Sequence, residues 1–126
     1  MLKALVVEDE GDIKQLLLEE LEDKGYQVQE AGNGEIALQR VSEEMPDIIF
    51  ADVYMPVMDG IDLITRLKGT PETSGIPVVM VTVMNARAIK AKARELGVGH
   101  YLTIRWESGE FDLILDQAMK SGSSGR

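Results

Sequence analysis

Short apolar runs alternate along this chain with longer segments of helical periodicity. Three runs of branched apolar residues, 4–7, 48–51 and 77–81, have the length of a strand and contain no polar alternation. Continuous runs of this kind are typical of parallel strands that are covered on both faces of a sheet. Residues 26–29 alternate between apolar and polar, which indicates an edge strand, and residues 100–104 form a fifth candidate strand.

Apolar residues recur at helical spacing between these runs, and the pattern predicts five helices. Their apolar stripes are Ile13, Leu16, Leu17 and Leu21; Ile36, Ala37 and Val41; Leu63, Ile64 and Leu67; Ile89, Ala93 and Leu96; and Phe111, Ile114, Leu115 and Ala118. Capping signals indicate the boundaries. We expect helix starts near Asn33, Asp59, Asn85 and Ser108, and helix ends near Lys24, Gly25, Gly69 and Gly97.

Strand and helix follow each other five times, which predicts an α/β fold with right-handed crossovers and helices on both faces of a parallel sheet. Five strands favour the flavodoxin-like, doubly wound order 2-1-3-4-5. The chain contains no internal repeat and no interdomain linker, so residues 1–120 are interpreted as one domain. Residues 121–126 (SGSSGR) are interpreted as a flexible tail or a cloning scar outside the fold.

Composition narrows the classes of function. The 126 residues carry a formal net charge of −9, so we expect no direct binding of nucleic acid, whose phosphates would repel the domain. The chain has no cysteine, which excludes disulfides and thiolate metal sites and favours the reducing cytoplasm. No apolar run approaches the roughly 20 residues that cross a bilayer, so we expect no membrane partner.

Carboxylates stand at the ends of two strands that we expect to be neighbours. Glu8, Asp9 and Glu10 follow the first strand, and Asp52 ends the third. Ligands of open parallel sheets bind beyond these carboxyl ends, so Glu8, Asp9 and Asp52 are expected in one crevice. Two carboxylates ~4 Å apart repel by ~4 kcal/mol at an effective dielectric constant near 20. A proton or a cation must offset this repulsion, and hard oxygen ligands favour Mg²⁺, or Mn²⁺ in its place.

A nearly buried aspartate beside Mg²⁺ is suited to form an acyl phosphate. This interpretation makes Asp52 the nucleophile and Asp9 a metal ligand, with Glu8 acting through a metal-bound water. The hydroxyl of Thr82, at the end of the fourth strand, is then placed to donate to a phosphoryl oxygen. Each residue also has a structural explanation: Asp9 or Glu10 as the start of the first helix, Asp52 as a loop cap, and Thr82 as an ordinary strand residue.

Four motifs resemble the receiver domain of two-component response regulators. They are VVEDE (6–10), DVYMPVMDG (52–60), VVMVT (78–82) and ELGVGHYLT (95–103). The second motif is the most specific, because it joins an aspartate after an apolar strand to Met-Pro and then to Met-Asp-Gly. The resemblance covers the chain from Leu2 to about Met119.

The resemblance implies a signalling protein in which Asp52 is the phosphoacceptor. Asp9 would be a direct Mg²⁺ ligand assisted by Glu8, and the backbone carbonyl of Tyr54 would be a further ligand. A sensor histidine kinase or phosphotransfer protein would supply the phosphoryl group. The protein would not be an enzyme beyond its own Mg²⁺-dependent phosphorylation and dephosphorylation.

The resemblance also implies how the signal would leave the domain. Thr82 would be the switch hydroxyl, and Tyr101 the aromatic residue that turns inward when Thr82 moves. The face formed by the fourth helix, the fifth strand and the fifth helix would bind a downstream protein or effector domain.

The chain departs from the family after the fifth strand. Family members carry a lysine followed by a proline there, whereas this chain has Ile104 and Arg105. Isoleucine lacks the charge-assisted contact, worth ~1.5–3 kcal/mol, that lysine makes with the acceptor and its phosphoryl group. Arg105 is the candidate substitute, although strand alternation directs it to the opposite side from residue 104. Without proline a cis bond is costly, so we expect this loop to take a different path.

Further departures concern the phosphoryl side of the predicted site. The family prefers a very small residue after the switch hydroxyl, whereas this chain has the branched Val83. Tyr54 and Met84, each two residues beyond a site residue, are bulky, and we expect them to slow hydrolysis of a phosphorylated Asp52.

Three other functions stay open. A degenerate receiver would bind its partner without phosphorylation, and Ile104 and Val83 favour it. A Mg²⁺-dependent phosphohydrolase would use a second aspartate where this chain has Tyr54. Flavin binding is disfavoured because the first loop is acidic. The only histidine, His100, is interpreted as a surface residue, and Trp106 as a cover for the base of the last helix.

Overall fold

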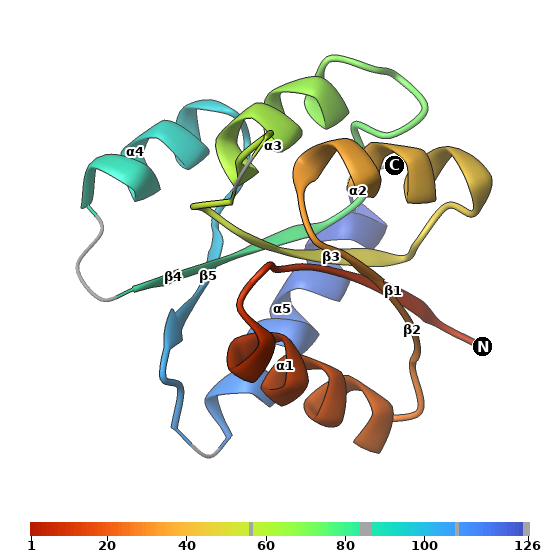
Figure 1. Ribbon diagram of the computed structural model, residues 1–126, viewed down its shortest axis with the longest axis vertical. Helices are drawn as coiled ribbons and strands as arrows, with labels where there is room; N and C mark the ends of the chain where they lie inside the picture. Colours follow the sequence, from red (N-terminus) through yellow and green to blue (C-terminus); the bar gives the residue numbers. More distant parts are fainter. Residues whose placement is uncertain (56, 84–86, 108, 125–126) are drawn as a thin grey trace.

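The computed structural model describes residues 1–55, 57–83, 87–107 and 109–124, without the side chains of residues 83 and 121–124. Strands and helices alternate along the described residues (Figure 1). The strands are β1 (Lys3–Val7), β2 (Gln27–Ala31), β3 (Ile48–Asp52), β4 (Val78–Val83) and β5 (His100–Ile104). The helices are α1 (Gly11–Asp23), α2 (Gly34–Glu43), α3 (Gly60–Lys68), α4 (Arg87–Glu95) and α5 (Glu110–Ser124).

The strands form one parallel sheet in the order β2-β1-β3-β4-β5, which confirms the predicted flavodoxin-like topology. In the register of this sheet, Val7 of β1 lies beside Ala51 of β3, and Asp52 of β3 lies beside Val81 of β4. The carboxyl ends of β1, β3 and β4 therefore meet at one edge of the sheet. This is the edge where the sequence predicted the site.

Helices cover both faces of the sheet, as predicted. Figure 1 shows α1 and α5 on one face and α2, α3 and α4 on the other. Along β1, Leu5 and Val7 pack with the residues of α2, α3 and α4, whereas Ala4 and Val6 pack with those of α1 and α5. All four side chains are buried. Burial on both faces explains why the strand carries no polar alternation.

Side-chain caps fix the starts of three helices. The Asn33 carbonyl oxygen accepts from the Ile36 N–H at 2.9 Å, and Asp59 accepts from the Asp62 N–H at 2.9 Å. Both caps were predicted. Glu10 caps α1 in the same way, so its role is structural. The predicted caps Asn85 and Ser108 lie outside the described residues.

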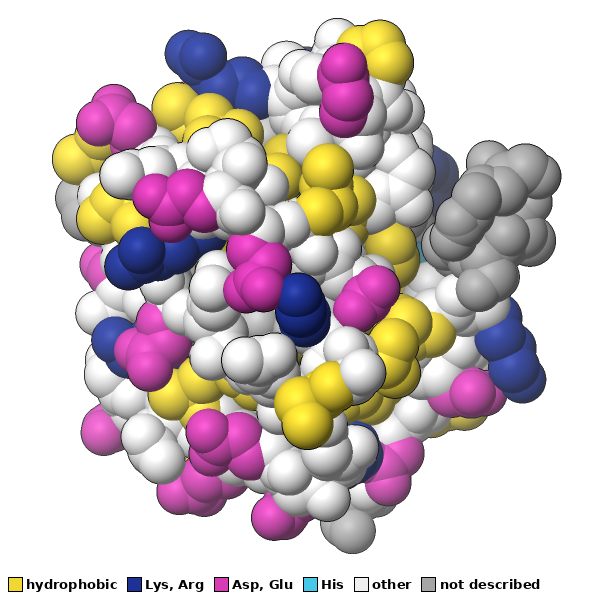
Figure 2. All heavy atoms as spheres, turned by 90° about the vertical axis from the view of Figure 1, so that its right-hand side faces the viewer, with side chains coloured by type: hydrophobic (Ala, Val, Ile, Leu, Met, Phe, Trp, Pro, Cys, Tyr) yellow, Lys and Arg dark blue, Asp and Glu magenta, His cyan; other side chains and the backbone are white. Residues whose placement is uncertain are grey.

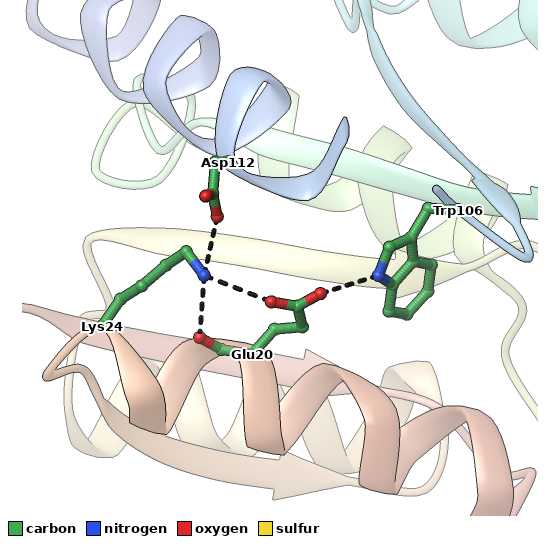
Figure 3. A network of polar contacts seen from close by, with 4 residues as sticks. All are labelled: Glu20, Lys24, Trp106 and Asp112. Carbon is green, nitrogen blue, oxygen red and sulfur yellow. Dashed lines mark hydrogen bonds and ion pairs between the residues drawn. The ribbon is translucent and has the colours of Figure 1, made fainter. Parts of the chain in front are cut away.

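A polar network joins α1 to the segment that follows β5 (Figure 3). The Trp106 indole N–H donates to Glu20 at 2.9 Å. The Lys24 ammonium pairs with Glu20 at 3.2 Å and with Asp112 of α5 at 2.7 Å, and it lies 5.3 Å from the centre of the Phe111 ring. The Trp106 ring packs against Phe111, which agrees with the predicted cover of the last helix.

The ends of two elements differ from the sequence prediction. Strand β2 begins at Gln27, one residue after the predicted start, because Tyr26 belongs to the turn that ends α1. Helix α5 continues to Ser124, past the boundary that we drew at residue 120. Among the described residues, no helix combines the length and the apolar character needed to span a bilayer.

Candidate metal and phosphoryl-acceptor site

Three carboxylates meet at the edge where β1 and β3 end. Glu8 and Asp9 follow β1 directly, and Asp52 is the last residue of β3. One carboxylate oxygen of each residue lies within 4.8 Å of the others. The sequence predicted this convergence from the parallel order of the strands. Asp9 and Asp52 therefore face a common space.

None of these carboxylates has a basic ion-pair partner among the described residues. Glu8 is only 1% exposed, and its Oε2 accepts from the Glu10 N–H at 3.1 Å, whereas its buried Oε1 has no hydrogen-bond partner there. Burial, together with the nearby Asp52 carboxyl, raises the pKa of Glu8 to about 8. Burial also raises the pKa of Asp52. Such shifts indicate a site that favours a proton or a cation.

The donor set fits a hard divalent cation. Carboxylate oxygens are the ligands that Mg²⁺ prefers, and no cysteine occurs in the chain. The Glu8 Oε1 has no hydrogen-bond partner among the described residues, so a bound cation or a proton would satisfy it. The carboxylates line an open cavity of about 630 Å³, which is large enough for hydrated Mg²⁺ and a phosphoryl group. The cavity is lined by Glu8, Asp9, Glu10, Gly11, Ile13, Asp52, Tyr54 and Ile104.

The loop after β3 brings α3 against the backbone of β3 next to Asp52. The Gly60 N–H donates to the Val53 carbonyl at 2.9 Å. A Cβ at Gly60 would overlap the Asp52 carbonyl oxygen, so only glycine fits this position. Val57 adopts φ 68°, which is rare for a branched residue, and its side chain is 76% exposed. This backbone holds Asp52 in place while Tyr54 borders the cavity.

The sequence did not identify this role of Gly60. The motif that contains Asp59 and Gly60 was interpreted as shaping the loop after Asp52 and starting the helix, without a contact to the Asp52 backbone. The signal was nevertheless present, because a glycine directly after an N-cap aspartate weakens a helix start unless a close backbone approach requires it.

Thr82 lies next to the acceptor strand. It follows Val81, which is the register partner of Asp52, and it is 2% exposed. In the same register Thr82 lies beside Thr103 of β5. The structure thus places Thr82 at the edge of the sheet that carries the carboxylates. Its predicted neighbour Met84 lies outside the described residues, as does the side chain of Val83.

Tyr101 lies beneath α4 and is half-buried. Its hydroxyl group is shared between the carbonyls of Lys90 and Val98, at 3.0 Å each. The Lys90 ammonium lies 5.4 Å from the centre of its ring. Tyr101 pairs in register with Met80, two residues before Thr82. The predicted switch residues are therefore on adjacent strands, and Tyr101 contacts α4 directly.

The end of β5 corrects one expectation. The peptide bond between Ile104 and Arg105 is cis, so the expected departure of this loop is wrong at this bond. The general cost of a cis bond that does not precede proline was therefore not enough to predict the conformation here. Ile104 lines the acidic cavity, whereas Arg105 is exposed and does not line it. In this structure Arg105 does not replace the lysine.

His100, the only histidine, lies near the surface, as the sequence indicated. His100 begins β5, at the end of the sheet opposite the carboxylates, and it is partly exposed. It does not line the acidic cavity.

Comparisons with known proteins agree with the motifs. One protein-family model, described as the response regulator receiver domain, matches residues 4–120. Response regulator PleD of Caulobacter vibrioides is 34% identical over 98% of this chain and 30% of its own length. The transcriptional regulatory protein PhoP of Bacillus subtilis, named for alkaline phosphatase synthesis, is 39% identical over 80% of this chain and 41% of its own length. The chain thus spans less than half of these curated relatives.

A solved structure has the same architecture. The signal receiver domain of a signal transduction histidine kinase from Syntrophus aciditrophicus superposes with a TM-score of 0.82 and 33% identity. The similarity covers 99% of this chain and 92% of that domain. The agreement therefore extends over the whole sheet and its helices.

Proposed function

The chain belongs to the response regulator receiver domain family, and on this premise we propose that Asp52 accepts a phosphoryl group from a histidine kinase or phosphotransfer protein. The observation that carries the proposal is the convergence of Glu8, Asp9 and Asp52 on one cavity, with a buried Glu8 oxygen that has no partner among the described residues. Glu8, Asp9, Asp52 and the Tyr54 carbonyl would hold Mg²⁺. The ion, when bound, neutralises charge on the phosphoryl oxygens.

The transfer itself is a displacement at phosphorus. A carboxylate oxygen of Asp52 forms a bond to phosphorus as the bond from phosphorus to the donor breaks, and the donor atom keeps the electron pair. The product is an acyl phosphate on Asp52. Glu8 and Asp9 contribute by binding and orienting, and Gly60 contributes by allowing α3 to support the Asp52 backbone.

The response to phosphorylation is proposed to pass through Thr82 and Tyr101. The hydroxyl of Thr82 would donate to a phosphoryl oxygen on the adjacent strand. Tyr101 already contacts the Lys90 carbonyl, so a movement of its ring would alter how α4 packs. The surface formed by α4, β5 and α5 would then bind a downstream protein or effector domain differently. We propose no catalysis beyond the phosphorylation and dephosphorylation of Asp52 itself.

A second candidate is a receiver that binds its partner without phosphorylation. The observation that favours it is Ile104 on the cavity wall, where a phosphoryl group meets an apolar side chain and no ammonium. In that case the carboxylates would serve as a pH- and cation-sensitive structural centre only. The two candidates differ in whether Asp52 needs to react.

Incubation with acetyl phosphate and Mg²⁺ separates them. We expect intact-mass spectrometry to detect the mass of one phosphoryl group on the wild type and none on Asp52→Asn. Omission of Mg²⁺ should abolish the gain. Absence of the gain in the wild type at high donor concentration would favour the phosphorylation-independent receiver. An equal gain in the variant would reject Asp52 as the acceptor.

A further inference from the structure

Helix α4 concentrates positive charge in an otherwise acidic chain. The whole chain has 22 acidic and 13 basic residues, yet the short helix α4 contains Arg87, Lys90, Lys92 and Arg94 against the single acid Glu95. Lys92 pairs with Glu95 at 4.0 Å. Within the described part of the chain, Arg87, Lys90 and Arg94 have no ion-pair partner. The charge on α4 is therefore not balanced by the chain itself.

Most basic side chains outside α4 have an acidic partner among the described residues. Figure 2 shows a face on which Lys and Arg side chains are interspersed among more numerous Asp and Glu side chains. Ion pairs on other elements hold Lys3, Lys14, Lys24, Arg40 and Lys120. A solvated face of ordinary composition would mix charges in the same way. Arg66, Lys68 and Arg105 also lack an ion pair among the described residues, but within that part of the chain α4 alone gathers three such cations on one helix.

The three unpaired cations form a stripe along the helix. Arg87, Lys90 and Arg94 are spaced so that they lie on one side of an α-helix, with Lys90 and Arg94 four residues apart. Like charges at this spacing repel, so the helix alone gains nothing from them. The exposed Ala91 lies between Arg87 and Arg94, and its small side chain lets another chain approach closely. The stripe therefore carries concentrated positive charge that no described residue of the chain pairs.

The fold does not need this side of α4. Ala93 is the buried residue of the helix, and Ile89 and Leu96 are partly buried against the core. Arg87 and Arg94 are exposed. Lys90 is different, because its carbonyl and ammonium both contact Tyr101 beneath the helix. A ligand on the stripe would therefore be sensitive to the position of Tyr101.

We propose that the basic stripe of α4, formed by Arg87, Lys90 and Arg94, binds an acidic polypeptide segment of a partner protein. The proposal rests on the output face named under the proposed function, but it does not require that Asp52 be phosphorylated. Charge complementarity selects the partner. A long polyanion such as duplex DNA would also meet the remaining surface, whose net negative charge repels phosphates.

A peptide titration followed by nuclear magnetic resonance tests the proposal. The probe is a synthetic helical peptide with Glu at i, i+4 and i+7, and its partner peptide has Gln at the same positions. The wild-type domain should bind the Glu peptide about tenfold more tightly than the Gln peptide, with amide shifts centred on α4, and the difference should shrink as salt rises. Arg87→Glu with Arg94→Glu should remove the preference.

Two further variants control for fold and net charge. Arg40→Glu with Arg66→Glu changes the net charge equally at exposed sites on α2 and α3, outside the α4-β5-α5 surface, and it should keep the preference. Arg87→Gln with Arg94→Gln retains the helix and should weaken binding without reversing charge. Equal losses in the control and the α4 variant, or equal binding of both peptides by the wild type, would overturn the proposal.

The same titrations distinguish binding of an acidic peptide from binding of other polyanions and from phosphorylation of Asp52. Binding of duplex DNA or of phosphatidylserine vesicles through α4, without binding of the Glu peptide, would also overturn the proposal. The Asp52→Asn domain should still bind the Glu peptide. If the domain binds the Glu peptide but gains no phosphoryl mass, only the proposed function is rejected. If it gains phosphoryl mass but does not bind the peptide, only this inference is rejected.

Discussion

Ile104 stands where the resemblance to receiver domains predicts a lysine. It lines the same cavity as Glu8 and Asp52, whose pKa values are both raised. A cation at this position would favour the charged form of both carboxyls. Isoleucine supplies no such charge, and the raised pKa values of both carboxyls favour a proton or a bound cation there. Residue 104 is therefore a position where a basic side chain would change the electrostatics of the acidic cavity.

The first prediction restores a lysine at this position. Ile104→Lys should increase the rate of Asp52 phosphorylation by acetyl phosphate, because an ammonium on the cavity wall attracts the donor and its transferred group. A contact worth ~1.5–3 kcal/mol corresponds to ~10–100-fold in rate. The rate is measured by intact mass against time. Ile104→Met is the matched control and should show no increase; a gain in both variants would contradict the electrostatic explanation.

At the scale of elements, α3 and β3 form one unit around Gly60. The absence of a side chain at Gly60 lets the first turn of α3 contact the carbonyl of Asp52. Asp59 caps the same turn, and Leu63, Ile64 and Leu67 bury the helix in the core. The backbone of Asp52 is thus held by a packed helix as well as by the sheet.

The second prediction concerns this contact. Gly60→Ala should destabilise the domain by ~1–3 kcal/mol, because the new methyl group overlaps the Asp52 carbonyl and forces the backbone to shift. Alanine is otherwise the better helix former, so the sign of the change is diagnostic. Gly75→Ala is the control, since a Cβ there meets open space. Urea unfolding measures both, and an unchanged or increased stability of Gly60→Ala would reject the close contact.

The network between α1 and α5 supports the segment that follows β5. Lys24 connects Glu20 to Asp112, and Glu20 holds the indole of Trp106. The contact with Asp112 raises the pKa of Lys24, so the cation is retained across the physiological range. Trp106 stands two residues beyond Ile104, so the network holds the chain shortly after β5 against α1 and α5 (Figure 3).

The third prediction removes the central cation of this network. Lys24→Met should cost ~1–2 kcal/mol of unfolding free energy, because Glu20 and Asp112 lose a shared partner and the Phe111 ring loses its cation. Lys92→Met is the matched control, since its ion pair with Glu95 is longer and both side chains are exposed, and its cost should stay below ~0.5 kcal/mol. The fluorescence of Trp106, the only tryptophan, reports the unfolding. Equal costs would show that the network adds no stability.

At the scale of the whole molecule, the fold followed from residue patterns. Continuous apolar runs required two covered faces, and the parallel order brought Glu8, Asp9 and Asp52 to one edge. Details that depend on side-chain packing did not follow. The contact of Gly60 with β3 is set by tertiary structure. The cis bond between Ile104 and Arg105 cannot be read from the residue types alone.

The overall charge and the buried carboxyls together predict how the stability of the domain depends on pH. The folded state holds a proton on Glu8 up to a pKa of about 8, whereas the unfolded chain releases it near the ordinary value of 4.5. Between these values the unfolded state binds fewer protons, so stability without metal should fall as pH rises from about 4.5 to about 8.

The fourth prediction follows from this linkage. Thermal melts of the metal-free wild type should show a falling melting temperature across that window, and Glu8→Gln should show a smaller fall because its amide does not ionise. Mg²⁺ should restore the wild type most strongly near the upper end of the window, where Glu8 is ionised, with a gain of ~2.7 kcal/mol at a hundredfold excess over the dissociation constant. Magnesium should stabilise Glu8→Gln less at every pH. If the melting temperature of the wild type changes with neither pH nor Mg²⁺, then the Glu8 carboxyl ionises as readily in the folded protein as in the unfolded chain.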